Sequence, residues 1–310
     1  MVTIAASSLW LSRCALASVS SVSATGRNFT AFVAFVGSRA VHQAFRADDV
    51  NTTLPDSLTS LTPLYPGTDS GGNALGNLLN PNVGQISAVL WRGDAYYKSF
   101  QAKLIVKTES FHAQAAYTYG NAQDTGSATV GGDTFGNSIS SLPYFNSRIR
   151  RGPADFNVAH NLVVSYNWYL PKAPHVAEPF QWVANGWQMG GVAQVSSGVP
   201  FTPNIGGDPL GLGSSDPFDF PDRVAGAGCN SLVNPGNVAA YVKTQCFAAP
   251  AQSNRRGNLG RNALTGPALR NVDFSLIKNT PVKRISEAFN VQFRIEMFNV
   301  FNHANFVNDD

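Results

Sequence analysis

The amino-acid sequence predicts an all-β fold of long antiparallel strands, and three observations lead to it. Apolar and polar residues alternate over several stretches, most regularly in residues 289–301, so an extended chain there has one apolar and one polar face. Charged residues make up 13% of the chain, against roughly a quarter in soluble globular proteins. The connections between these stretches alternate between long and short. No apolar run approaches the ~18 residues of a membrane-spanning helix.

Seven stretches are expected to form the strands of this fold. They are residues 29–45, 96–107, 111–119, 158–170, 186–197, 269–278 and 289–301. The second and third are joined by residues 108–110 alone and form the clearest hairpin. Gly37 interrupts the first stretch and predicts a β-bulge there. The last stretch is longer than the roughly five or six residues of an ordinary strand and is close to the ~9–11 of a tilted membrane-spanning strand.

The lengths of the connections distinguish a membrane barrel from a soluble sandwich. The long connections are residues 47–95, 120–157 and 198–268, and the short or moderate ones are residues 108–110, 171–183 and 279–288. Outer-membrane barrels have long external loops at one end and short periplasmic turns at the other, whereas a sandwich or a propeller gives no reason for this alternation. We therefore expect an antiparallel transmembrane β-barrel segment of about seven long strands, an incomplete barrel with long external loops.

Aromatic residues gather near the ends of the expected strands. An interfacial girdle at the two membrane surfaces would require this distribution, although aromatic residues of a core would give the same pattern. The residues are Tyr96, Tyr97, Tyr117, Tyr119, Trp168, Tyr169, Phe298 and Phe301.

Residues 1–25 are ambiguous. Ala15, Leu16 and Ala17 are similar to a signal-peptidase site, but Lys and Arg are absent before the apolar core and Arg13 interrupts the stretch after it. The interpretation we favour is a divergent strand, or a start inside a longer reading frame. The chain is accordingly divided into a divergent or signal-like segment, residues 1–25, and a partial barrel domain, residues 26–310.

The chain has three cysteines, Cys14, Cys229 and Cys246, of which the last two flank a loop rich in Gly, Pro and Asn. We predict a disulfide between Cys229 and Cys246, which requires an oxidising compartment such as the periplasm or the cell surface. Two unrelated thiols are the alternative.

Enzymatic and nucleic-acid-binding functions find little support in the sequence. The five histidines lie far apart without a metal-binding spacing, and the nucleophile elbow Gly-x-Ser-x-Gly is absent. Asp155 and His160 could form a catalytic pair, but a structural hydrogen bond is the favoured interpretation. The acidic run 208–222 lacks the spacing of a calcium loop, and Asp-Pro turns explain it better. The net charge of +3 is scattered, so we expect no nucleic acid, no cofactor and no enzymatic activity.

Six segments, in order along the chain, carry a resemblance to a known family. They are FVAFVGSRAVHQ (32–43), SFQAKL with QAAYTYG (99–104 and 114–120), RGPADFNVAHNLVVSYNWYLP (151–171), GWQMGGVAQVSSGVPFTP (186–203), the loop from GGDPLGLGSSDPFDFPDR (206–223) to Cys246, and residues 258–306. Residues 30–306 thereby resemble the C-terminal barrel of Oar-like TonB-dependent outer-membrane receptors. The resemblance implies a large outer-membrane barrel that imports a bulky solute, with an N-terminal plug pulled by TonB.

The sequence departs from that family in ways that affect the expected function. We find no plug and no TonB-contacting segment, and about seven strands fall short of the 22 that close such transporters. A strand that returns after residues 287–301 is also missing. We therefore expect an internal piece of a transporter that is not competent alone. Its partners would be outer-membrane lipid, an unknown bulky solute, and the TonB complex only through a plug outside this chain.

Two sets of residues are candidates for function or for structure. Lys103, Arg294 and Glu296 fall on the expected lumen faces, where they would touch a plug or a solute, or would simply be solvated in a water-filled interior. Arg151, Asp155 and His160 belong to a structural motif that precedes and begins a strand. The alternative function is a small stand-alone outer-membrane barrel or adhesin-like surface protein that binds through its long loops.

Overall fold

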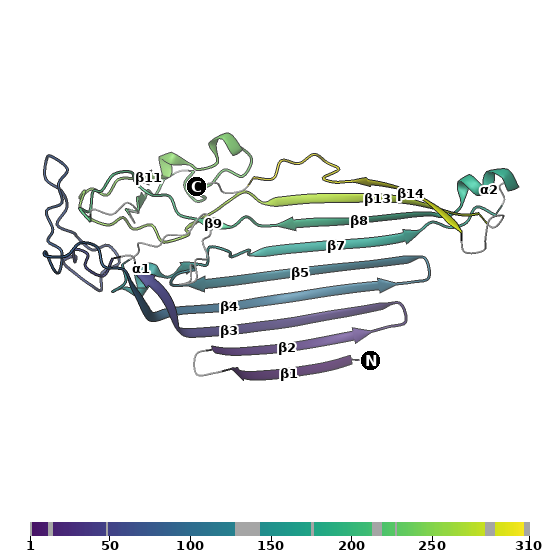
Figure 1. Ribbon diagram of the computed structural model, residues 1–310, viewed down its shortest axis with the longest axis horizontal. Coiled ribbons are helices and arrows are strands. Elements are labelled where there is room, and N and C mark those ends of the chain that lie inside the picture. The colour runs from purple at the N-terminus through teal and green to yellow at the C-terminus, as the bar shows by residue number, and fades with distance from the viewer. Residues whose placement is uncertain are drawn as a thin grey trace.

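One curved antiparallel sheet dominates the computed structural model, which describes residues 2–11, 15–47, 49–127, 143–174, 177–212, 219–226, 228–282 and 289–306. The sheet has ten strands, of which nine are arranged in the order β1-β2-β3-β4-β5-β7-β8-β13-β14, and short β6 (Gly152–Pro153) pairs with β5 (Figure 1). The nine are β1 (Val2–Leu11), β2 (Ala15–Thr25), β3 (Phe29–Ala47), β4 (Ala88–Lys107), β5 (Phe111–Asp124), β7 (His160–Tyr169), β8 (Trp187–Ser196), β13 (Leu269–Pro281) and β14 (Asn290–Met297).

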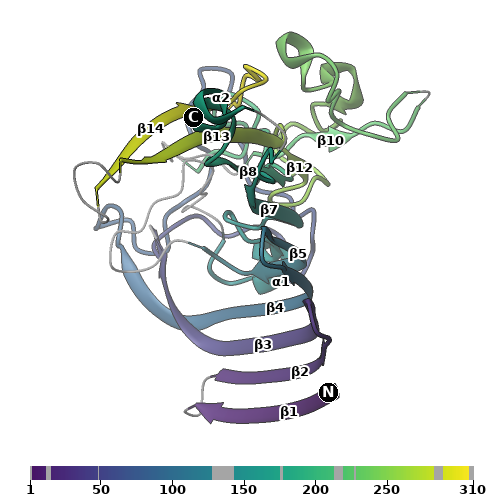
Figure 2. The same ribbon diagram turned by 90° about the vertical axis from the view of Figure 1, so that its right-hand side faces the viewer.

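The sheet curves into a trough, with β1 and β14 at its two edges (Figure 2). Within the described residues these two edge strands do not pair with each other, so the barrel is not closed. The predicted fold class, a largely all-β antiparallel membrane barrel segment, is confirmed. No described helix is both long enough and apolar enough to cross a membrane.

The prediction of about seven strands is too low. Residues 1–25 form β1 and β2, which continue the sheet outward from β3. β2 consists largely of Ala and Ser, and residues 5–8 in the middle of β1 are Ala and Ser, so the period-two alternation of polarity is weak in the sequence. Residue 26, at which the sequence was divided, lies in the turn between β2 and β3, which pair with each other.

Three further details differ from expectation. Gly37 pairs in register with Lys98, and the irregularity lies at residues 40–44, where His42 has a φ of 56°. β4 begins at Ala88, eight residues of sequence before the expected start at position 96. β14 ends at Met297, because Asn299 and Asn302 adopt a φ of 48° and take the chain out of the extended conformation.

The connections separate by length between the two ends of the sheet, as predicted (Figure 1). The three long connections, in their described parts residues 49–87, 125–127 with 143–159, and 197–268, gather at one end, and we call them the loop assembly. It contains α1 (Ser147–Arg150), β9 (Pro200–Phe201), β10 (Asp222–Arg223), β11 (Phe247–Ala248), β12 (Leu264–Thr265) and two 3-10 turns (Val238–Ala240 and Thr244–Cys246). The opposite end has short turns and α2 (Glu178–Ala184), which joins β7 to β8.

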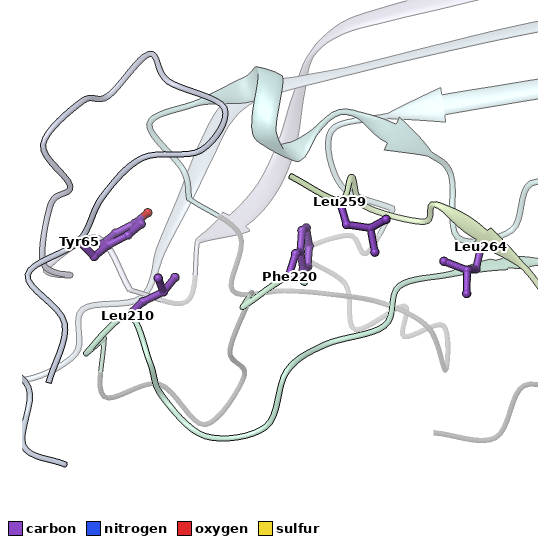
Figure 3. Close-up of a cluster of buried hydrophobic side chains, with 5 residues drawn as sticks. All are labelled: Tyr65, Leu210, Phe220, Leu259 and Leu264. Atoms are coloured by element: carbon purple, nitrogen blue, oxygen red, sulfur yellow. The ribbon is translucent and has the colours of Figure 1, made fainter. Parts of the chain in front are cut away.

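The compact apolar core lies in the loop assembly and not against the sheet. Five side chains, each 4% exposed or less, form it: Tyr65, Leu210, Phe220, Leu259 and Leu264 (Figure 3). On the strands, by contrast, large apolar side chains are exposed, such as Phe35 at 62% and Phe293 at 55%. An apolar surface of this kind on a sheet marks a contact with something other than water.

Candidate functional site

The strand register divides the sheet into two chemically different faces. Lys103 is aligned with Ala116, Val163, Gln194 and Asn271 across four successive strand pairs, so these residues share one face. Side chains on this inner face are mainly polar: Gln101, His112, Gln114, Asn161, Ser165, Asn167, Gln188, Asp273, Ser275, Gln292, Arg294 and Glu296. The period of two in the sequence therefore corresponds to a real segregation of polarity across the sheet.

The outer face is apolar along the same strands. Leu104, Ala115 and Val164 are aligned across β4, β5 and β7, and Phe274 and Met297 are aligned across β13 and β14. The residues of this face that remain exposed include Val33, Phe35, Leu104, Leu162, Val195, Val291, Phe293, Ile295 and Met297. A barrel in a membrane requires this arrangement, with apolar side chains toward lipid and polar side chains toward the interior.

A hollow of about 680 Å³ lies against the inner face, lined by residues of β4, β5, β7, β8, β13 and β14. Its lining includes His112, Asp273, Arg294 and Glu296. Nη1 of Arg294 is 3.5 Å from Oε1 of Glu296, and about half of each side chain is exposed. Lys103 lies on the same face but outside the lining of this hollow. The hollow thus offers hydrogen-bond donors, acceptors and both signs of charge to a polar solute or to a protein segment in the barrel interior.

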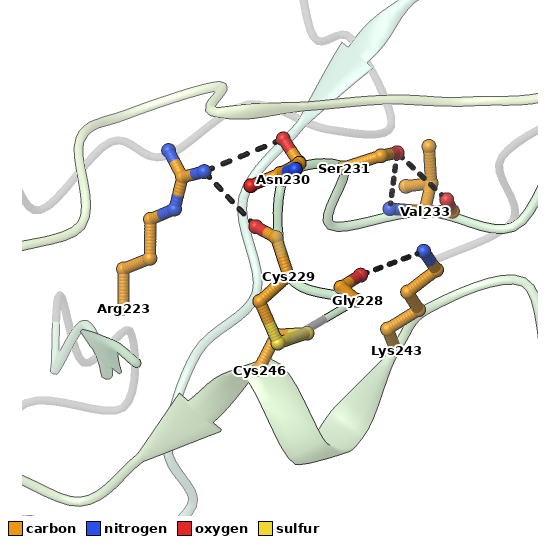
Figure 4. The surroundings of a disulfide bond; sticks show 8 residues. All are labelled: Arg223, Gly228, Cys229, Asn230, Ser231, Val233, Lys243 and Cys246. Atoms are coloured by element: carbon orange, nitrogen blue, oxygen red, sulfur yellow. Dashed lines mark hydrogen bonds between the residues drawn. A yellow bond between two sulfur atoms is a disulfide. The ribbon is translucent and has the colours of Figure 1, made fainter. Parts of the chain in front are cut away.

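The predicted disulfide between Cys229 and Cys246 is present in the loop assembly, with Cα atoms 5.5 Å apart (Figure 4). Nη2 of Arg223 donates to the carbonyl oxygens of Cys229 and Asn230, at 3.1 and 3.4 Å. Nζ of Lys243 donates to the carbonyl oxygen of Gly228 at 3.0 Å. The disulfide and these charge-assisted hydrogen bonds hold a hairpin-like excursion of the longest connection in one shape.

Arg261 joins the loop assembly to the end of the sheet. Its guanidinium is buried and pairs with two carboxylates, through Nη2 with Asp124 at the end of β5 and through Nη1 with Asp155 at 2.8 Å. Nε of Arg261 donates to the carbonyl oxygen of Arg150 at 2.9 Å. Asn262 adds a 2.6 Å hydrogen bond from Nδ2 to Oδ1 of Asp155. Because every charge in this network is desolvated, loss of one partner would leave another buried and unpaired.

Arg150 extends the same network under the loops. Its guanidinium lies 3.4 Å from the ring centroid of Phe45, and its Nε donates to the carbonyl oxygen of Thr125 at 2.9 Å. Burial, and then the positive charge of Arg261, lower the pKa of Arg150 to about 10. No local pattern in the sequence indicates this network, because Arg261 and Asp155 are 106 positions apart.

The structure places Arg151, Asp155 and His160 in three different surroundings. Arg151 is half exposed and lies 3.7 Å from a carboxylate oxygen of Asp94. Asp155 is buried and accepts hydrogen bonds from Arg261 and Asn262, as described above. His160 begins β7 on the outer face, with Nδ1 2.8 Å from Oη of Tyr117 and its ring 4.9 Å from that of Tyr119. Asp155 accepts structural hydrogen bonds, as the favoured interpretation expected. Its partners Arg261 and Asn262, however, lie in a connection more than 100 positions further along the chain.

Asp219 is a buried carboxylate beside the apolar core. Within the described part of the chain, neither of its carboxylate oxygens has a hydrogen-bond partner, and Asp219 is 2% exposed. Burial, and then the charge of Asp208, raise the pKa of Asp219 to about 7. Among the residues that the structure describes, no three His, Cys, Asp or Glu side chains come close enough to hold a metal ion.

Comparison with known proteins complements this geometry. A family model described as an outer membrane beta barrel domain matches residues 21–310. The solved structure of the outer membrane transporter YddB from Escherichia coli matches with 10% identity and a TM-score of 0.45 over 93% of this chain, which spans 29% of that structure's chain. A search of curated proteins gave no match. The match over nearly the whole length, together with the two-faced sheet, shows that the chain belongs to the family of outer membrane β-barrel domains and is located in the outer membrane.

Proposed function

We propose that this chain forms part of the barrel of an Oar-like TonB-dependent transporter that takes up a bulky solute. The observation that carries the proposal is the polar inner face, with its hollow of about 680 Å³, behind an apolar outer face. A small closed barrel fills its interior with side chains, whereas a wide barrel leaves space for water, a plug or a solute. The six sequence segments that resemble Oar-like receptors support the assignment to TonB-dependent transporters.

Within the part of the chain that the structure describes, β1 and β14 each have one unpaired edge, which supports a role as one part of a wider barrel. In lipid every backbone amide and carbonyl group needs a partner, and an unpaired strand edge is therefore costly. Further strands that pair with these two edges would remove that cost. In the complete barrel Lys103, Arg294 and Glu296 would face the interior, where they would contact the plug or the solute. The proposed role is passage across the membrane and not catalysis.

Electrophoresis without heating tests the proposed partial barrel. Closed barrels stay folded in detergent and migrate faster before heating than after it, because they remain compact. We expect the 310-residue chain, refolded alone in detergent, to give no compact band. A compact, heat-modifiable band from this chain alone would contradict the partial-barrel proposal.

A genetic comparison tests TonB dependence separately. Bacteria that carry an in-frame deletion of this coding region should lose growth on the same bulky iron, sugar or peptide sources as bacteria that lack TonB. Restoration of growth by the wild-type gene in the deletion strain, but not in the strain without TonB, is the expected result. Growth defects that differ between the two strains would overturn the proposal.

The loop assembly supports a second candidate, a stand-alone surface barrel or adhesin-like protein. Its buried core, its disulfide and the Arg261 network give the external loops a defined shape, as a binding surface requires. The compact gel band described above would favour this candidate. Binding of the purified chain to intact host cells or surface polymers would then identify its partner.

A further inference from the structure

Helix α2 presents apolar side chains at the end of the sheet that is opposite to the loop assembly (Figure 1). Of its seven residues, Phe180, Trp182 and Val183 are 65%, 63% and 54% exposed. Burying side chains of this size typically contributes about 1.5–3 kcal/mol each, so leaving three of them in water on one short helix is unfavourable. The helix therefore requires an apolar environment that the described residues do not provide.

A hydrogen bond connects α2 to the outer face of the sheet. Trp187 lies on that face, because it shares alternate positions of β8 with Val195, which is aligned with Leu162. Nε1 of Trp187 donates to the carbonyl oxygen of Val183 at 2.8 Å. The C-terminal part of α2 thus lies next to the outer face, which contacts lipid.

The backbone between α2 and β8 fixes this position. Gly186 has a φ of 84°, and a Cβ atom there would lie 2.2 Å from the carbonyl oxygen of Asn279. Nζ of Lys278 donates to the carbonyl oxygen of Asn185 at 2.5 Å and lies 5.9 Å from the ring centroid of Trp187. Both contacts of Lys278 join the turn that follows α2 to β13.

The outer face carries its apolar belt and exposed aromatic residues up to the short-turn end of the sheet, which is the end that holds α2 (Figure 1). The outer face from Phe100 to the end of β4 spans about 23 Å at ~3.3 Å per residue, close to the ~25 Å belt of membrane barrels. At the same end of the sheet, Phe29 and Trp168 are 50% and 39% exposed. Aromatic residues in these positions form the girdle at the level of the lipid headgroups.

We propose that α2 lies in the headgroup region of the phospholipid leaflet at the short-turn end, with Phe180, Trp182 and Val183 in contact with lipid. The helix anchors the connection between β7 and β8 to the membrane surface. Short amphipathic helices bind in this way when their apolar side chains reach the boundary between headgroups and acyl chains. The inference depends on the outer-membrane location and not on TonB dependence or on the solute.

Fluorescence of Trp182 tests the proposal, measured in phospholipid vesicles that hold the complete barrel to which this chain belongs. Subtracting the emission of the Trp182→Phe variant from that of the wild type isolates this residue, and the substitution keeps an aromatic ring, so folding should be preserved. We expect lipids with bromine near the headgroup end of the acyl chain to reduce the difference emission to about half, as for an interfacial indole. Aqueous iodide should have little effect.

Trp91 is the matched control, because it is 67% exposed but lies at the loop end of β4. The difference emission obtained with Trp91→Phe should be quenched by iodide and not by brominated lipid. The proposal is wrong if Trp182 behaves as Trp91 does, or if its difference emission does not change with lipid. Stronger quenching by bromine near the terminal methyl group would also overturn it, because it would place the helix too deep.

Discussion

The sheet and the loop assembly distribute their apolar residues in opposite ways. On the sheet, Phe35 is 62% exposed and the opposite face is polar, whereas in the loop assembly Phe220 is fully buried among other apolar side chains. The difference reflects the surrounding medium, since lipid accepts apolar side chains and water excludes them. The loops therefore fold as a small water-soluble protein does, around a core, while the strands are stable only with lipid on one side. Single substitutions can test this contrast.

The largest effect is expected from Arg261→Ala in the loop assembly. The substitution leaves Asp124 and Asp155 buried without their cation, which typically costs about 3–5 kcal/mol. Limited proteolysis and hydrogen exchange should show the loops opening while the strands stay protected. Arg294→Ala is the control, because its ion pair with Glu296 is half exposed. Equal effects of the two substitutions would contradict a structural role for the buried network.

A charge placed on the sheet should act according to the face that receives it. Leu104→Arg puts a cation on the outer face, where it should destabilise the inserted barrel by about 2–4 kcal/mol near mid-membrane. Gln114→Arg is the matched control on the inner face of the neighbouring strand and should cost little. The yield of folded protein in vesicles across a urea series measures both, with each substitution made in the complete barrel to which this chain belongs. A larger loss from Gln114→Arg would reverse the assignment of the two faces.

Reduction of the disulfide should weaken the loop assembly and leave the sheet intact. Cys229 and Cys246 are separated by 17 positions, and closing a loop of that size contributes about 3 kcal/mol in the chain-entropy estimate. The Cys229→Ser/Cys246→Ser double variant should therefore lower the midpoint of loop opening, monitored by protease sensitivity of residues 223–247. Far-UV circular dichroism of the strands should stay unchanged. If circular dichroism shows the strands unfolding with the loops, the two regions are not independent.

How much the sequence can predict also differs between the two regions. The hairpin of β4 and β5 and the two faces of the sheet could be predicted, because a period of two is written directly in consecutive residues such as 100–106. For residues 1–25 the sequence predicts at most one divergent strand and not the hairpin of β1 and β2, since Ala and Ser, which are frequent there, do not mark either face. The Arg261 network could not be predicted, because residues that lie far apart in the chain meet only after the loops fold. The disulfide could be predicted from the sequence, because two cysteines flank one loop.

The smallest of these effects is expected from Asp219→Asn, and it depends on pH. Burial raises the pKa of Asp219 from 3.8 to about 7, so the folded loop assembly binds a proton more tightly than the unfolded chain does. The contribution of Asp219 to the stability of the loop assembly should therefore be greatest below pH 4, and should fall as pH rises from about 4 through 7. Asparagine cannot ionise, so the variant should lose this dependence and gain about 1–3 kcal/mol at pH 8. Hydrogen exchange of the loops at pH 5 and pH 8 measures the change, with Asp69→Asn, an exposed carboxylate, as the control. If wild type and Asp219→Asn respond to pH alike, other groups in the folded loops already stabilise the ionised carboxylate. The contrast between an apolar core in the loops and a polar interior in the barrel would then need another explanation.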